Sequence, residues 1–355
     1  MSLNTPLTRL LGEASFHAFS GIKTPVVAAP MAGASGGALA AHVTAAGALG
    51  FLAAGYLDAT SLCKEISLAR GVLNLTPSDR LPIGVGYLAW KLEKSTVAEA
   101  EDMLNAALDN NVQAMWLAFG VRLSEWIRYI RTYDNIHRRS SPTLIFVQVA
   151  SVEEALVAIK NWKVDVVVAQ GNESGGHGYG SAPPLLTLIP SILQCLHEDS
   201  SPLLAAGGLS NGSQIASLLT LGAAGVVLGT RFLATPESLY TEAQKNALVA
   251  AKPASTIRTM AFDNARGTLD WPAGVDGRAL YNDTVKDLDE GADISTVREK
   301  FKKGVREGDP DRMLVWAGTG VGLISEIMDA KDVVRELHSD TVKRLKAVSE
   351  LYTGN

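Results

Sequence analysis

One histidine of the chain lies in a glycine-rich segment, AQGNESGGHGYG at residues 169–180. Gly175, Gly176 and Gly178 surround His177, and they exclude it from the interior of a helix. The unperturbed pKa of histidine is close to neutrality, so an imidazole suits proton abstraction or the stabilisation of an anion. The plainer alternative is a histidine that only forms hydrogen bonds within its own loop. We interpret His177 as the candidate catalytic residue.

Two later loops carry glycines where an anion would fit. In AAGGLSNG (205–212), Gly207 and Gly208 let backbone N–H groups approach an anion without an intervening Cβ. In LGTRF (228–232), Gly229 offers the same freedom and Thr230 adds a hydroxyl. Either loop alone could be no more than a tight turn. Because the two follow the last two predicted strands, where α/β barrels usually bind phosphate, together they predict a phosphate site.

The elements that must position these loops form a repeated strand-then-helix pattern. Eight strands are predicted at 25–29, 49–54, 82–88, 113–119, 143–149, 164–170, 202–206 and 225–229. Most lack in-and-out alternation, which is typical of strands buried on both faces. The clearest helices are predicted between them at 37–48, 96–109, 122–133, 151–162 and 211–221. Eight such units predict a closed (β/α)8 TIM barrel of the α/β class, with an open doubly wound sheet as the alternative.

The strand-then-helix pattern stops after Thr230. We therefore predict a barrel domain at 1–230 that carries the phosphate site, and an inserted, mostly helical cap or substrate region at 231–315. Helical signals at 285–306 and 321–350 predict C-terminal helices, at 316–355, that pack back on the barrel. The cap should cover the end of the barrel to which the strands point, because barrel enzymes place their chemistry there.

Composition narrows the classes of function. Hydrophobic residues make up 47% of the chain and charged residues 19%, the formal net charge is −5, and the positive charges are scattered. These values disfavour nucleic acid or an anionic membrane surface as partners. No stretch approaches the length of a membrane span, and neither end resembles a targeting signal, so a cytoplasmic enzyme is expected. Two cysteines, Cys63 and Cys195, predict buried free thiols, and the absence of CxxC, HxH and HExxH spacings predicts no metal site.

Taken together, the motifs resemble the nitronate monooxygenase family, formerly called 2-nitropropane dioxygenases. No single segment is specific for this family, but the combination of AQGxExGGH with AAGG and GTRF is specific for it. The resemblance runs through LTRLLG (7–12), IKTPVVAAPMAG (22–33), QVASVEEA (148–155), AQGNESGGHG (169–178), AAGGLSNGSQI (205–215), LGAAGVVLGTRF (221–232) and AGTGVGLISEI (317–327).

The resemblance implies FMN as cofactor and no metal. The implied reaction is the oxidation of alkyl nitronates, and of nitroalkanes once deprotonated, by O2 to carbonyl compounds and nitrite. His177 matches the histidine that the family uses as a base or to position the anionic substrate. The implied cofactor contacts are Pro30, Met31 and Ala32 at the flavin ring, Gln148 and Gly176 beside it, and Ala206, Gly207, Gly208, Gly229 and Thr230 at the phosphate. A small-molecule substrate and a monomer or homodimer are expected.

This chain departs from the family pattern at three places. Gly86, in GVGYL (84–88), takes a cofactor-contacting position where the family often has asparagine, and Thr319 replaces the glutamine of a late GQ motif. An extra segment, EASFHAFSG (13–21), precedes the first strand.

Two other activities stay open at this point. One is an FMN-dependent reductase of the same barrel type, which would use NAD(P)H to reduce quinones or enoyl thioesters. The other is a flavin-free barrel lyase or isomerase for sugar phosphates, which should show a catalytic lysine or paired carboxylates at the strand ends. Glu173 is the one acidic residue well placed for that chemistry.

Overall fold

Eight parallel strands close into a barrel in the computed structural model, which describes residues 22–139, 141–197 and 200–353. The predicted barrel is confirmed, and the open sheet is wrong. Each strand pairs with the next around the ring, and Val27 of β1 pairs with Val227 of β9 to close it. The strands are β1 (Val26–Ala28), β2 (Leu49–Ala53), β3 (Leu81–Leu88), β4 (Val112–Ala118), β5 (Leu144–Val149), β6 (Val166–Gln170), β8 (Leu203–Ala206) and β9 (Gly225–Leu228).

The barrel interior is packed with aromatic side chains. Phe51 makes edge contacts with Trp116 and Phe146, with ring centroids 5.3 and 5.1 Å away. Gly84 faces Phe51, and a Cβ at Gly84 would lie 2.1 Å from its ring. The absence of a side chain on β3 therefore makes room for the large ring on β2. This plug closes the barrel below the strand ends, so a ligand can enter only above it.

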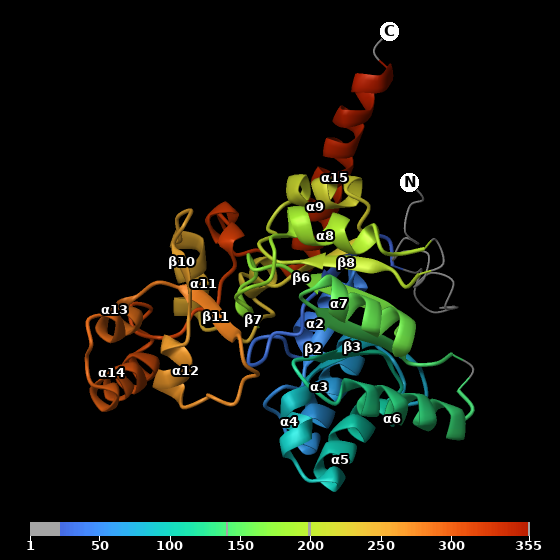
Figure 1. Cartoon of the computed structure of the whole chain (residues 1–355), viewed down its shortest axis with the longest axis horizontal. Helices are drawn as coiled ribbons and strands as arrows, with labels where there is room; N and C mark the ends of the chain where they lie inside the picture. Colours follow the sequence, from blue (N-terminus) through green and yellow to red (C-terminus); the bar gives the residue numbers. More distant parts are fainter. Residues whose placement is uncertain (1–21, 140, 198–199, 354–355) are drawn as a thin grey trace.

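A ring of helices covers the outside of the barrel (Figure 1). The long last helix, α15, packs against α9 and α2, so it takes the place of the helix that would follow β9. The barrel helices are α2 (Gly37–Ala45), α3 (Ala59–Val72), α4 (Ala89–Lys94), α5 (Val97–Leu108), α6 (Leu123–Ile136), α7 (Val152–Leu156), α8 (Leu185–Leu193), α9 (Gly212–Thr220), α10 (Thr230–Leu233) and α15 (Ala330–Thr353).

The segment 231–315 forms a body beside the barrel, on the left of Figure 1. It contains the helices α11 (Glu242–Ala250), α12 (Ala261–Arg266), α13 (Asp283–Asp289) and α14 (Ile294–Glu307), and the strands β10 (Thr256–Thr259) and β11 (Val275–Leu280). Strand β11 lies between β10 and β7 (Gly176–Tyr179) in an antiparallel sheet. The sheet was not predicted, although the burial of β11 alternates strictly, as a half-exposed strand requires. The proposed domain limits at 230 and 315 stay a prediction.

Several smaller predictions need correction. The helix predicted at 151–162 is α7 followed by one π-turn (Val157–Asn161), and that predicted at 321–350 starts only at Ala330, after a 3-10 turn (Thr319–Leu323). The prediction that both thiols are buried is also wrong. Cys63 is half-buried, and Cys195 is exposed because α8 ends two residues before Cys195. The segments 7–12 and 13–21 lie outside the described residues. None of the helices in the described ranges combines the length and apolar character that crossing a bilayer requires.

Candidate active site

A cavity of about 520 Å³ lies above the aromatic plug. Loops that follow the barrel strands, strand β7 and residues of the segment 231–315 line it together. It brings together every residue that the sequence indicated for catalysis or cofactor binding. These are Pro30, Met31, Ala32, Gly86, Gln148, Gly176, His177, Ala206, Gly207, Gly208, Gly229 and Thr230. Trp271 and Trp316 also line it.

The loop after β1 forms one wall of the cavity. Ser35 holds this loop, because its hydroxyl accepts a hydrogen bond from the Met31 N–H at 3.2 Å and donates to the Ala29 carbonyl at 3.0 Å. A Cβ at Gly86 would lie 2.3 Å from the Cβ of Pro30. Gly86 stands where the family pattern often has asparagine. Because Gly86 has no side chain, Pro30 can pack directly on β3.

The two glycine loops lie under a third segment that the sequence did not single out for this role. Gly207 and Gly208 have φ angles of +135° and +68°, values that favour glycine. A Cβ at Gly208 would lie 2.6 Å from the Thr319 hydroxyl oxygen. The Gly318 N–H donates to the Thr230 hydroxyl at 2.9 Å, so the hydroxyl proton of Thr230 remains for another acceptor.

A chain of amides connects β5 to the histidine strand. Gln148 Nε2 donates to Gln170 Oε1 at 2.9 Å, and Gln170 Nε2 donates to the His177 carbonyl at 3.2 Å. Because the Gln148 and Gln170 side chains also line the cavity, the chain places polar groups on its wall and fixes the backbone of His177.

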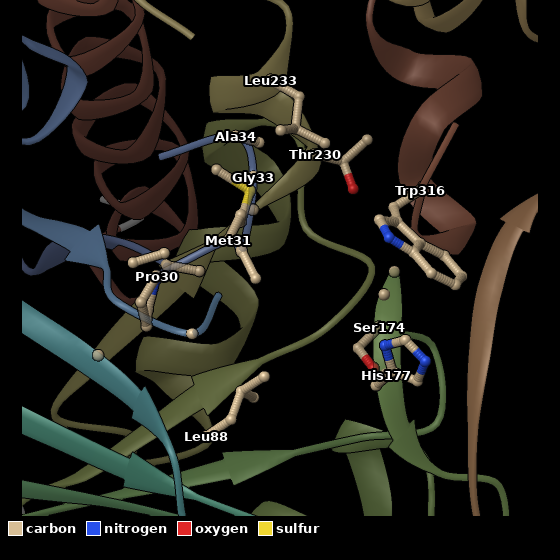
Figure 2. A pocket seen from close by; sticks show the side chains of 18 of the residues that line it. Pro30, Met31, Gly33, Ala34, Leu88, Ser174, His177, Thr230, Leu233 and Trp316 are labelled. Carbon is tan, nitrogen blue, oxygen red and sulfur yellow. The ribbon is translucent and has the colours of Figure 1, made fainter. Parts of the chain in front are cut away.

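His177 lies on β7 rather than in a free loop. It pairs with Gly277 of β11, and a Cβ at Gly277 would lie 2.4 Å from the Trp316 ring. Figure 2 shows His177 and Trp316 on one side of the cavity, with Pro30 and Met31 across from them. Strand β7 and Trp316 thus contribute to one wall, and the loop after β1 contributes to the opposite wall.

Asp263 on α12 is the functional residue that sequence reasoning missed. His177 Nε2 lies 3.0 and 2.9 Å from its two carboxylate oxygens. Asp263 is fully buried, and its Oδ1 also accepts from the Thr268 hydroxyl at 2.7 Å and from Trp271 Nε1 at 3.2 Å. Nothing in the local sequence FDNAR distinguishes this aspartate from a helix-surface residue.

The surroundings of His177 favour its neutral form. Its side chain is 8% exposed, and burial lowers the pKa of His177 below its ordinary value. The Asp263 carboxylate opposes that change, while the positive charges of Arg266 and Arg258 add to it. A neutral imidazole is the form that accepts a proton.

The cavity wall carries little formal charge. Arg266 is the one lining residue, among those the structure describes, that is permanently charged, and no lysine or carboxylate lines the cavity there. Glu173 has a structural role: its carboxylate accepts from the Leu185 N–H at the start of α8. Within the described ranges, no group of three or more histidine, cysteine or acidic residues is arranged to hold a metal ion.

A closed (β/α)8 barrel with one histidine in a mostly apolar cavity at its strand ends defines a barrel enzyme that acts on a small ligand. The family can be stated from comparison with known proteins. The model of the nitronate monooxygenase family matches residues 14–340, and the chain belongs to that family.

Individual relatives agree with this assignment. The chain is 34% identical to nitronate monooxygenase npaC of Metarhizium robertsii over 334 residues, which is 88% of this chain and 90% of that protein. The structure resembles nitroalkane oxidase from Streptomyces ansochromogenes, with a TM-score of 0.74, 29% identity, and coverage of 92% of this chain and 98% of the other. It resembles FabK from Thermotoga maritima with a TM-score of 0.74, 26% identity and 99% coverage of both chains.

Proposed function

We propose that this protein oxidises alkyl nitronates with bound FMN and O2, releasing nitrite and a carbonyl compound. The observation that carries the proposal is His177: a buried imidazole, with a pKa lowered by burial, on the wall of a cavity whose other wall is the Pro30–Met31 loop. Membership of the nitronate monooxygenase family and the names of the relatives support the same reaction.

The residues of the cavity fit FMN. Gly207 and Gly208 line the cavity with positive φ angles and no side chain, so an anion can approach their backbone N–H groups, and Thr230 retains a hydroxyl proton to donate. These groups would hold the phosphate, and the Pro30–Met31–Ala32 wall would contact the ring. Bound FMN would supply the electron-transfer chemistry that amino-acid side chains do not.

The charge distribution suits an anionic substrate. A nitronate carries one negative charge, and Arg266 supplies a positive charge without a neighbouring carboxylate on the wall. Most of the other lining residues are apolar or aromatic, and a less polar surrounding strengthens that attraction. A sugar-phosphate lyase would need a lysine or paired carboxylates at the cavity, and the described lining residues include neither.

The test combines the colour of the protein with its turnover. We expect the purified protein to be yellow and to release FMN, not FAD, on heating. Nitrite release is then measured under O2 with a preformed nitronate and with the parent nitroalkane. Steady NAD(P)H consumption with a quinone, without nitrite release, would instead identify a reductase. A colourless protein that fails to bind added FMN would refute the flavin assignment.

A further inference from the structure

Asp263 makes no direct contact with the cavity, yet it determines which nitrogen of His177 can act there. Asp263 is absent from the lining residues, whereas His177 is among them. The two are joined by Nε2 of the ring and both carboxylate oxygens. They come from different parts of the chain, His177 from the sheet strand β7 and Asp263 from helix α12.

The carboxylate imposes one tautomer on the ring. An ionised carboxylate only accepts hydrogen bonds, so the Nε2 that faces it must carry a proton. A neutral imidazole has one N–H, which leaves Nδ1 as an unprotonated acceptor. In Figure 2 one ring nitrogen of His177 points toward Pro30 and Met31 across the cavity and the other points away. Because Nε2 is held by Asp263, Nδ1 is the nitrogen turned toward the cavity.

We infer that Asp263 is a positioning residue that makes Nδ1 of His177 the base for neutral nitroalkanes. This inference rests on the proposed function. In the step, the α-carbon C–H bond breaks and its electron pair stays on the nitronate formed. The proton becomes the Nδ1–H of an imidazolium, whose positive charge the Asp263 carboxylate stabilises at the opposite nitrogen. The net charge of the site does not change, because the nitronate anion and the imidazolium cation form together.

Further contacts restrict rotation of both partners. Thr268 and Trp271 both donate to Asp263 Oδ1, so two further hydrogen bonds hold the carboxylate in place. The Trp271 ring stacks on the imidazole, with centroids 3.6 Å apart and planes 13° apart, and Trp316 meets it edge-on at 4.8 Å. A flipped ring would lose the bond to Asp263 and leave a buried carboxylate short of a donor, which is unfavourable.

Asp263→Asn tests this assignment, because an amide can donate to Nε2 and stabilise the opposite tautomer. We expect kcat/KM for the neutral nitroalkane to fall by roughly 10²–10⁴, the scale of losing a general base. The preformed nitronate should lose much less, since its proton is already gone. Asp134→Asn is the matched control: Asp134 is also buried, and it bonds Thr143 on the outside of the barrel. It should leave the ratio of the two activities unchanged.

The pH profile of the Asp263→Asn variant distinguishes the loss of a positioning contact from a general disruption of the site. The kcat/KM for the nitroalkane should rise with pH as His177 loses its proton, with a midpoint at its pKa. Asp263 raises that pKa, whereas burial and the charges of Arg266 and Arg258 lower it. Removing the carboxylate charge should therefore move the midpoint to lower pH while the plateau falls. A disrupted site that admits water would instead move the midpoint of kcat/KM to higher pH, and that result would overturn the inference.

A spectroscopic measurement reads the tautomer in the wild-type protein directly, so it does not require any Asp263 variant to fold. The chain has six histidines, and comparison with a His177→Asn sample assigns the ¹⁵N signals of His177 in histidine-labelled holoenzyme. Above the pH midpoint we expect a protonated Nε2 and an unprotonated Nδ1. A protonated Nδ1 would overturn the inference even if nitrite is released. Absent nitrite release would refute the proposed function, while the signals would still identify the tautomer.

Discussion

The indole of Trp271 lies flat on the imidazole of His177, with ring centroids 3.6 Å apart and planes 13° apart. The same indole donates its Nε1–H to Asp263 at 3.2 Å. Trp271 thus shields the face of the histidine and also holds its partner. Because burial is the largest influence on the pKa of His177, much of that influence should depend on this one side chain.

Trp271→Ala should move the pH midpoint of kcat/KM for a nitroalkane upward. Removing the indole admits water to the imidazole, and it frees Asp263 to interact more strongly with His177. Both changes raise the pKa of a histidine. Trp271→Phe keeps a ring over the imidazole and should give a smaller change. A midpoint that does not move in the alanine variant would show that Trp271 does not govern the protonation of His177.

His177→Asn should retain FMN and lose turnover of the neutral nitroalkane by roughly 10²–10⁴. The flavin should remain bound because the protein groups proposed to hold its phosphate come from other loops. The preformed nitronate should suffer less, since only its positioning is affected. Nitrite release under O2, with both substrates compared side by side, provides the measurement. Equal losses would mean that His177 positions the anion without abstracting a proton.

Gly207→Asp and Gly207→Asn form a pair that tests the phosphate site. Both side chains have the same shape and meet the same strain, since φ is +135° and a Cβ would lie 3.1 Å from the Ser174 nitrogen. The difference between them is one negative charge. We expect the aspartate variant to bind FMN at least about tenfold more weakly than the asparagine variant, a difference of about 1.4 kcal/mol.

Riboflavin, which has no phosphate, is the control ligand for this pair. Titration of the apoprotein with riboflavin should give equal affinities for the two variants. A difference that persists with riboflavin would place the phosphate elsewhere in the cavity.

Arg266→Gln should lower kcat/KM for a nitronate by roughly tenfold at low salt, because it removes the one permanent charge among the described lining residues. Arg266→Lys should retain most of the activity and its salt dependence. Measurement well above the pH midpoint keeps the effect of Arg266 on His177 out of the comparison. Unchanged salt dependence in the glutamine variant would show that Arg266 does not attract the substrate.

The sequence by itself determined the barrel and the strand-end loops that line part of the cavity. Strands buried on both faces appear as continuous apolar runs, and closely spaced turns after them contain glycine, so strand and loop can both be predicted locally. Gly207, Gly208, Gly229 and Thr230 follow β8 and β9 directly, and closure of the barrel brings them to one cavity. His177 was also predictable, because its chemical type and its glycine neighbours are local features.

The tertiary structure alone decided what surrounds the histidine. Asp263 lies 86 residues from His177 in the chain, and the two meet only because β7 pairs with β11 in a sheet outside the barrel. Gly318 likewise reaches Thr230 across 88 residues. A partner of this kind leaves no local pattern, because its position follows from long-range strand pairing and helix packing. The tautomer of His177 and the direction of its pKa change depend on those contacts, so neither could be predicted from the residues around position 177.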